Sequence, residues 1–111
     1  MRHTVLILSR SDDAHLDRLT QELDQLHHSW IRFDPGDFPQ HVTLRFELGD
    51  SDKTQGYLSF RGKRIALEEI GSIWYRRPTP IQAPADLPPL QQTFIEREAR
   101  AGLWGMLRTL N

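Results

Sequence analysis

The first third of the chain contains two short apolar runs separated by a helical pattern. Val5 to Leu8 is continuously apolar, which is typical of a strand covered on both faces in a parallel sheet. Leucines at positions 16, 19, 23 and 26 recur at the spacing of one helix face and predict a helix from about Asp12 to His28. A second strand is predicted from Trp30 to Phe33. The order strand, helix, strand predicts parallel neighbours joined by a right-handed crossover.

The middle of the chain changes to a period of two. Between Val42 and Leu48, apolar residues alternate with polar ones, which predicts a strand with one solvent-facing side. A polar turn at 49–53 and a second run from Tyr57 to Phe60 predict the returning strand of a hairpin. A tight turn at 61–63 is expected to lead into a third short strand.

That third strand is predicted from Arg64 to Leu67. A single helical turn is expected at 68–70. The apolar run Ile73 to Tyr75 then predicts a strand that returns to the parallel sheet. Five prolines from 78 to 89 predict an extended loop, because proline fixes φ and lacks the backbone N–H.

The last predicted element is a helix from Leu90 to about Leu110, with Pro89 tolerated at its start. The stretch 101–107 is apolar nearly all round, and such a helix is normally covered on more than one side. We therefore expect part of it to face another domain or a second copy of the chain. The expected contact surface consists of Leu103, Trp104, Met106, Leu107 and Leu110. The alternative is that these side chains all pack on the chain's own sheet.

Together these patterns predict one α/β domain over residues 1–111. The expected architecture is a small Rossmann-like unit: a mixed sheet with a β-hairpin insertion and two main helices. A length of 111 residues allows one modest core and not two.

The composition of the chain excludes several classes of function. The net charge is −1, whereas general nucleic-acid binders usually carry a strong basic excess, so no nucleic-acid partner is expected. The chain has no cysteine, which excludes disulfides, thiol chemistry and cysteine-ligated metals. The apolar run near the N-terminus is too short for a signal peptide or a membrane span. These features predict a cytoplasmic protein without a membrane partner.

Two adjacent arginines follow the strand that ends at Tyr75. In open α/β sheets, ligands bind outside the carboxyl ends of the strands. Pro78 favours an extended backbone at Arg77, so Arg76 and Arg77 should point to opposite sides. A guanidinium suits a carboxylate or a phosphate, so Tyr75, Arg76 and Arg77 are candidate substrate-binding residues. The alternative is that the arginines pair with local acids such as Glu68, Glu69 or Asp34.

Two aspartates follow the second strand in the same way. Asp34 and Asp37 flank Pro35 and Gly36 in a rigid turn, where their carboxylates are candidate substrate-binding groups. The alternative is an Asx-type turn in which both side chains accept hydrogen bonds from backbone N–H groups.

Motifs for self-sufficient catalysis are missing from the sequence. The five histidines show no metal-ligand spacing such as HExxH, so no metal site is expected. No G-x-S-x-G nucleophile motif is present. The first strand is followed by Ser9-Arg10-Ser11-Asp12 rather than by a glycine-rich phosphate loop. No catalytic residues are therefore predicted in this chain.

Four segments nevertheless resemble a known family. VLILSRSDDAHLDRLTQEL, IRFDPGDFP, GSIWYRRP and FIEREARAGLWGML occur in the order and spacing found in the N-terminal, pre-ATP-grasp domain of graspetide (microviridin-type) peptide ligases. The similarity spans essentially all 111 residues. Its most specific parts are Asp37-Phe38-Pro39, the string from Trp74 to Pro78, and the helix containing Glu98-Ala99 and Trp104.

The resemblance implies an ATP-grasp enzyme about three times as long, which activates a side-chain carboxylate of a precursor peptide as an acyl phosphate. A hydroxyl or amine then attacks to form an ester or amide crosslink. ATP and magnesium would be held by downstream domains absent from this chain, so the chain alone is expected to be non-catalytic. The implied partners are those downstream domains or a second copy, and the precursor peptide. Arg76 or Arg77 would orient a substrate carboxylate or an acyl-phosphate oxygen.

Two other function classes stay open at this point. A receiver-type signalling domain has a similar length and opening, but here Ser9-Arg10-Ser11 precedes Asp12-Asp13 and the last lysine is Lys63. The other class is a stand-alone interaction module that dimerises through its last helix. Such a module would bind a peptide along the strand edge near Val42 to Leu48.

Overall fold

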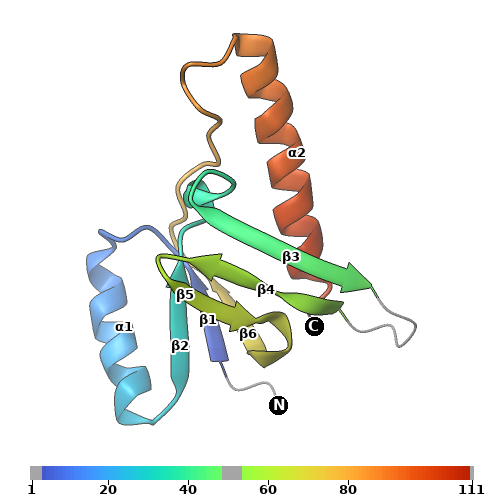
Figure 1. The fold of residues 1–111 in the computed structure, drawn as a ribbon. Coiled ribbons are helices and arrows are strands. Elements are labelled where there is room, and N and C mark those ends of the chain that lie inside the picture. Colours follow the sequence, from blue (N-terminus) through green and yellow to red (C-terminus); the bar gives the residue numbers. More distant parts are fainter. Residues whose placement is uncertain (1–3, 49–53, 111) are drawn as a thin grey trace.

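The computed structural model describes residues 4–48 and 54–110 (Figure 1). The strands are β1 (Thr4–Leu8), β2 (Ser29–Phe33), β3 (Val42–Leu48), β4 (Thr54–Phe60), β5 (Lys63–Ala66) and β6 (Ile70–Tyr75). The helices are α1 (Ala14–Gln25) and α2 (Pro89–Arg108), and two single 3-10 turns are η1 (Pro35–Asp37) and η2 (Leu67–Glu69). The expected polar turn at 49–53 lies outside the described residues.

The first sheet is parallel and has the order β2-β1-β6. Leu6 of β1 is opposite Ile31 of β2 on one side and Ile73 of β6 on the other. Both neighbours of the central strand run in its direction, which confirms the predicted β-α-β opening and the return of the chain to this sheet at β6.

The two faces of β1 belong to two different hydrophobic clusters. Val5 and Ile7 pack with Leu16 and Leu23 of α1. Leu6 and Leu8 face the opposite way, into a larger cluster that includes the second sheet and α2. Because both faces of β1 are covered, the strand has a continuous apolar run rather than an alternating pattern.

The second sheet is antiparallel and has the order β3-β4-β5. Val42 is opposite Phe60, which confirms the predicted hairpin, and Leu58 is fully buried against the larger cluster. The tight turn into β5 uses positive φ angles of 48° at Arg61 and 73° at Gly62. The hairpin strands thus form a sheet of their own that packs over one face of the parallel sheet.

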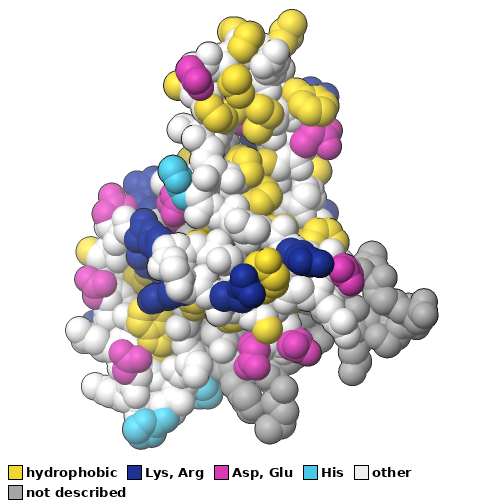
Figure 2. All heavy atoms as spheres, viewed as in Figure 1, with side chains coloured by type: hydrophobic (Ala, Val, Ile, Leu, Met, Phe, Trp, Pro, Cys, Tyr) yellow, Lys and Arg dark blue, Asp and Glu magenta, His cyan; other side chains and the backbone are white. Residues whose placement is uncertain are grey.

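Helix α2 has two halves with different surroundings. Its first turns project away from both sheets (Figure 1), and Leu90 and Phe94 are 87% and 63% exposed there. Figure 2 shows hydrophobic side chains gathered over this upper end of the molecule. The second half enters the larger cluster, where the buried side chains are Ala99, Leu103, Met106, Leu107 and, after the helix, Leu110.

The expected open surface at the end of α2 is therefore wrong for four of its five residues. Leu103, Met106, Leu107 and Leu110 are enclosed by the chain's own fold, and Trp104 is half-buried. The two sheets together provide the cover that one sheet was not expected to provide. Ala101, Gly102 and Gly105 face the solvent. Because none of them has a polar side chain, the sequence of this segment appeared apolar on every side.

The predicted α/β fold class with two main helices and a hairpin insertion is confirmed. Helix α1 is shorter than expected, because it begins after its N-cap Asp13 and ends at Gln25. Neither of the helices in the described part of the chain is long and apolar enough to span a bilayer.

Candidate functional site

The carboxyl ends of the three parallel strands bring polar residues to one edge of the sheet. Ser9 follows β1, Asp34 follows β2 and Arg76 follows β6. Backbone hydrogen bonds continue past the strands: Arg76 N–H donates to the Leu8 carbonyl (2.9 Å) and Ser9 N–H to the Phe33 carbonyl (3.2 Å). This edge is where the sequence placed the candidate substrate-binding residues.

A buried carboxylate, Asp13, lies at the centre of one polar network. Its Oδ2 accepts a hydrogen bond from Ser9 Oγ at 2.9 Å, and its Oδ1 accepts one from His15 N–H at 3.2 Å as the N-cap of α1. Arg76 Nε lies 3.5 Å from Oδ2. The network ties the start of α1 to the end of β6 and gives Ser9, which is also fully buried, a hydrogen-bond partner.

The surroundings of Asp13 favour its charged form. Burial alone would raise the pKa of its carboxyl group. The hydrogen bond from Ser9, the positive charge and hydrogen bond of Arg76 and the His15 N–H outweigh burial and hold the pKa below its usual value. Asp13 is therefore a charged structural anchor at neutral pH.

Arg76 thus braces the fold, and its partner is Asp13 rather than the acids considered from the sequence. Arg77 is exposed, and its backbone carbonyl accepts a hydrogen bond from Arg10 N–H at 2.9 Å. Its side chain makes no ion pair within the described residues. Neither arginine lines the two hollows described below, so substrate binding by Arg76 or Arg77 stays a prediction.

Asp34 holds two loops together. Its Oδ1 accepts hydrogen bonds from Gly36 N–H (3.1 Å) and Thr79 N–H (2.9 Å), and its Oδ2 accepts one from Thr79 Oγ1 (2.8 Å). The loops after β2 and β6 meet so closely that a Cβ at Gly36 would collide with the Thr79 side chain. The Asx-type alternative therefore describes Asp34, with an additional link to a residue 45 positions away.

Asp37 lies on the other side of the same turn. Its carboxylate is 4.0 Å from a guanidinium nitrogen of Arg61, which is in the turn between β4 and β5. Its backbone carbonyl accepts a hydrogen bond from His41 N–H at 2.7 Å. Asp34 and Asp37 thus face different neighbours and do not form a common carboxylate pair.

A cleft of about 500 Å³ opens between the loop after β6 and helix α2. Tyr75, which is 66% exposed, packs against Trp104 with 5.7 Å between the ring centroids. Arg100 and Arg108 lie one turn on either side of Trp104 along α2 and also line the cleft. We call this hollow, with its floor of prolines 35, 78 and 80, the carboxyl-edge cleft.

Two guanidinium groups beside two aromatic rings suit a ligand that carries a carboxylate next to an apolar group. Tyr75 was predicted as a site residue from the sequence, whereas Arg100 and Arg108 were missed. The signal for them was the spacing of Arg100, Trp104 and Arg108, four residues apart each, which puts all three on one helix face.

The described part of the chain shows no cluster of residues suited to bind a nucleotide or a metal ion. No group of three or more His, Asp or Glu side chains there is arranged to hold a metal ion. The turn after β1 contains no glycine, and its Ser9 and Arg10 N–H groups already donate to the carbonyls of Phe33 and Arg77. These residues do not fit ATP and magnesium, and we derive no step through either from this chain.

The model of the MvdD pre-ATP grasp domain family matches residues 4–111. The chain belongs to this family. The resemblance stated from the sequence is thereby confirmed. A comparison with curated proteins found no match.

Solved structures with the same fold include two that are more than 25% identical to this chain. Macrocyclase MdnB from Microcystis aeruginosa MRC is 28% identical, with a TM-score of 0.86 over 96% of this chain and 35% of that protein. A RiPP-associated ATP-grasp ligase from Chryseobacterium gregarium, solved with ADP and a leader and core peptide, is 27% identical, with a TM-score of 0.82 over 96% of this chain and 32% of that protein.

A third structure, macrocyclase MdnC from Microcystis aeruginosa MRC bound with precursor peptide MdnA, is 24% identical. Its TM-score is 0.86 over 97% of this chain and 35% of that protein, and this likeness shows the fold alone. The chain spans about a third of the length of each of these three proteins.

Proposed function

We propose that this chain acts as the N-terminal domain of an ATP-dependent peptide ligase. The ligase forms ester or amide crosslinks between side chains of a ribosomally made precursor peptide, as in microviridin-type products, and works in the cytoplasm. The observation that supports this most strongly is the 28% identity to macrocyclase MdnB over 96% of the chain. Membership in the pre-ATP-grasp family favours this function over the receiver-type alternative.

Within that enzyme, the chain's role is to form one wall of the substrate cleft. Arg100 and Arg108 pair with a carboxylate of the precursor, and the Tyr75–Trp104 pair packs against the neighbouring apolar group. ATP supplies the phosphoryl group that activates the carboxylate, and no residue described here is assigned to that step. The exposed Leu90 and Phe94 on the first half of α2 contact another domain of the enzyme or a second copy.

The test uses the complete ligase that contains this domain, incubated with its precursor peptide, ATP and magnesium. Mass spectrometry is expected to detect the loss of one water for each crosslink formed. Arg100→Ala combined with Arg108→Ala should raise the KM for the peptide roughly ten-fold or more, because two charge-assisted contacts are lost. Arg97→Ala, an exposed arginine of α2 outside the cleft, is the matched control and should leave the KM unchanged.

The proposal fails if the complete protein leaves the precursor's mass unchanged in the presence of ATP and magnesium. The stand-alone interaction module is then the remaining candidate. The specific observation in its favour is the exposure of Leu90 and Phe94 on a projecting helix. Sedimentation of the 111-residue chain over a concentration series would show the dimer that this candidate requires.

A further inference from the structure

The outer edge of the parallel sheet has features that the proposed cleft does not use. β2 is an edge strand, since the strand order is β2-β1-β6. The Phe33 carbonyl points toward the β1 side, where it accepts a hydrogen bond from Ser9 N–H. Because backbone groups alternate along a strand, the N–H and C=O groups of Trp30 and Arg32 point outward, away from β1. No strand of the described part of the chain pairs with them.

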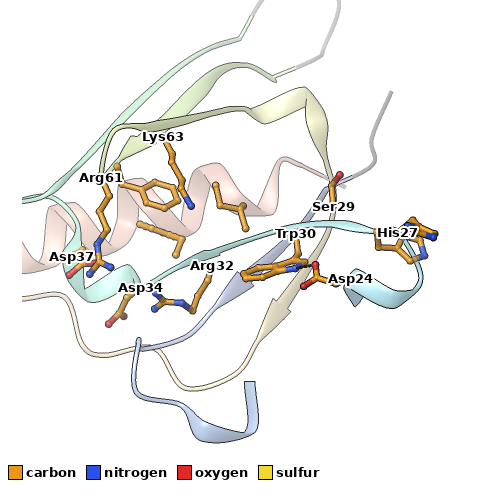
Figure 3. A pocket seen from close by; sticks show the side chains of 13 residues that line it. Asp24, His27, Ser29, Trp30, Arg32, Asp34, Asp37, Arg61 and Lys63 are labelled. Atoms are coloured by element: carbon orange, nitrogen blue, oxygen red, sulfur yellow. Dashed lines mark hydrogen bonds and ion pairs between the residues drawn. The ribbon is translucent and has the colours of Figure 1, made fainter. Parts of the chain in front are cut away.

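A groove of about 610 Å³ runs along this open edge, and we call it the edge groove. One wall is formed by the whole of β2 (Ser29–Phe33), and the other by Phe60, Arg61 and Lys63 at the turn between β4 and β5. Figure 3 shows Lys63 and Arg61 on one side of the groove, with Trp30 and Arg32 on the other. The groove therefore combines an unpaired strand edge with side chains on both sides of it.

The acidic side chains of the edge groove have partners within the protein, whereas two of its basic side chains do not form ion pairs in the described part of the chain. Asp24 accepts a hydrogen bond from Trp30 Nε1 at 2.8 Å, Asp34 is held by Gly36 and Thr79, and Asp37 is paired with Arg61. Among the described residues, Arg32 and Lys63 form no ion pair. The acids of the groove thus already have partners, whereas two of its cations are available to an anionic ligand.

We propose that the edge groove binds an extended peptide segment with carboxylate side chains, which adds a strand next to β2. Its backbone pairs with the outward groups of Trp30 and Arg32, and its acidic side chains lie against Arg32 and Lys63. A second copy of the chain is a poorer occupant, because pairing two β2 edges would bring the same cations together. The inference does not depend on the proposed ligase activity, since it concerns binding by the 111-residue chain itself.

The test is a calorimetric titration of the chain with a blocked seven-residue peptide that has glutamate at its three central positions and valine elsewhere, so that an added strand presents carboxylates on both faces of the sheet. Binding is expected to weaken as salt is raised, because exposed ion pairs are screened. The same peptide with glutamine in place of glutamate should bind about ten-fold more weakly. A second control is the glutamate peptide in which the amides on the edge facing β2 are N-methylated. It should bind about ten-fold more weakly, because it has no N–H groups to donate to the carbonyls of β2.

Variants of the chain locate the site. Arg32→Gln and Lys63→Gln should each weaken binding of the glutamate peptide roughly three-fold or more. The matched control is Arg18→Gln on α1, whose side chain is 89% exposed and does not line the groove; it should bind the peptide as the unaltered chain does. Amide chemical shifts, with circular dichroism as a check of folding, should show that the peptide perturbs Trp30 and Arg32.

Three results would overturn the proposal. One is the absence of binding by a folded chain, which would mean that the cations only keep the edge from self-association. Another is equal binding of the glutamate and glutamine peptides. The third is self-association of the unaltered chain through β2, detected by sedimentation together with shift changes at Trp30 and Arg32. Each of these outcomes is distinct from a failure of the ligase proposal, which is measured by crosslinking in the complete enzyme.

Discussion

The carboxyl edge and the outer edge of the parallel sheet use polar side chains in opposite ways. At the carboxyl edge, Asp13 and Asp34 accept hydrogen bonds that fasten one segment of the chain to another. At the outer edge, Arg32 and Lys63 lie along a groove without an ion pair in the described part of the chain. Asp13 and Asp34 are held by the protein's own contacts, whereas the backbone edge of β2 is unpaired in the described part of the chain. We call these two regions the closed edge and the open edge.

The difference shows why a charged residue next to a strand end is weak evidence of ligand binding. Arg76 follows β6 and looked like a ligand contact, yet it lies against the buried carboxylate of Asp13. Arg32 is inside a strand and was not predicted as a binding residue from the sequence. It nevertheless lines the edge groove, where its guanidinium can pair with an anionic ligand. Whether a charge has an internal partner is decided by which segments the fold brings together.

The largest effect is expected from breaking the Asp34 link at the closed edge. Asp34→Ala leaves the N–H groups of Gly36 and Thr79 without their acceptor, which should lower the free energy of unfolding by about 2 kcal/mol. Gly36→Ala should cost a similar amount, because its Cβ would displace Thr79. Urea denaturation measures both.

The matched control for the Asp34 link is Asp37→Ala. Asp37 has only a partly exposed ion pair at 4.0 Å, so its removal should cost about 0.5 kcal/mol or less. Equal costs for Asp34→Ala and Asp37→Ala would contradict the structural role assigned to Asp34.

A smaller and pH-dependent effect is expected at Asp13. Its pKa in the folded chain lies below the unfolded value, so its contribution to stability is complete above pH of about 4 and is lost as the pH falls through the folded value. Asp13→Asn keeps an N-cap side chain but removes the charge. It should lower the Tm by roughly 5 °C at pH 7 and by less at pH 2 to 3.

Thermal denaturation at both pH values checks this expectation. Asp12→Asn is the control, since Asp12 is exposed and its ion pair with Arg10 spans 3.7 Å. A Tm decrease for Asp13→Asn that is the same at both pH values would mean that the charge of Asp13 does not stabilise the fold.

The smallest effect is expected at the open edge. Arg32→Gln and Lys63→Gln remove no ion pair seen in the described residues, so each should change the free energy of unfolding by less than about 0.5 kcal/mol. Denaturant titration of the two variants measures this. A loss above 1 kcal/mol at either position would show that the cation is engaged internally and would remove the distinction between the two edges.

The fold followed from the sequence because its main signals are local. The apolar run of β1, the leucine spacing of α1 and the alternation in β3 each report on a single element. The end of α2 was misjudged because covering it takes two sheets whose relative packing is not a local property. In addition, Gly102 and Gly105 lie on the solvent-facing side of α2, and because they have no polar side chains the sequence does not indicate that this side is exposed.

The candidate sites were less accessible from the sequence. Asp34 and Thr79 are 45 residues apart, and Asp13 and Arg76 meet only because β1 and β6 are neighbours in the sheet. Their pairing depends on strand order, which the sequence pattern does not fix. The arginines of the carboxyl-edge cleft had a detectable signal, the helical spacing of Arg100 and Arg108 around Trp104, because that contact is set by one helix.

Amide hydrogen exchange of the free chain, followed residue by residue by NMR, tests the contrast between the two edges most directly. The N–H groups of Arg10 and Arg76 donate to backbone carbonyls at the closed edge and are expected to exchange slowly. The N–H groups of Trp30 and Arg32, which point out of the sheet, are expected to exchange at rates close to those of an unstructured peptide. Slow exchange at Trp30 and Arg32 in the isolated monomer would contradict the account, because it would show that the outer edge is already paired.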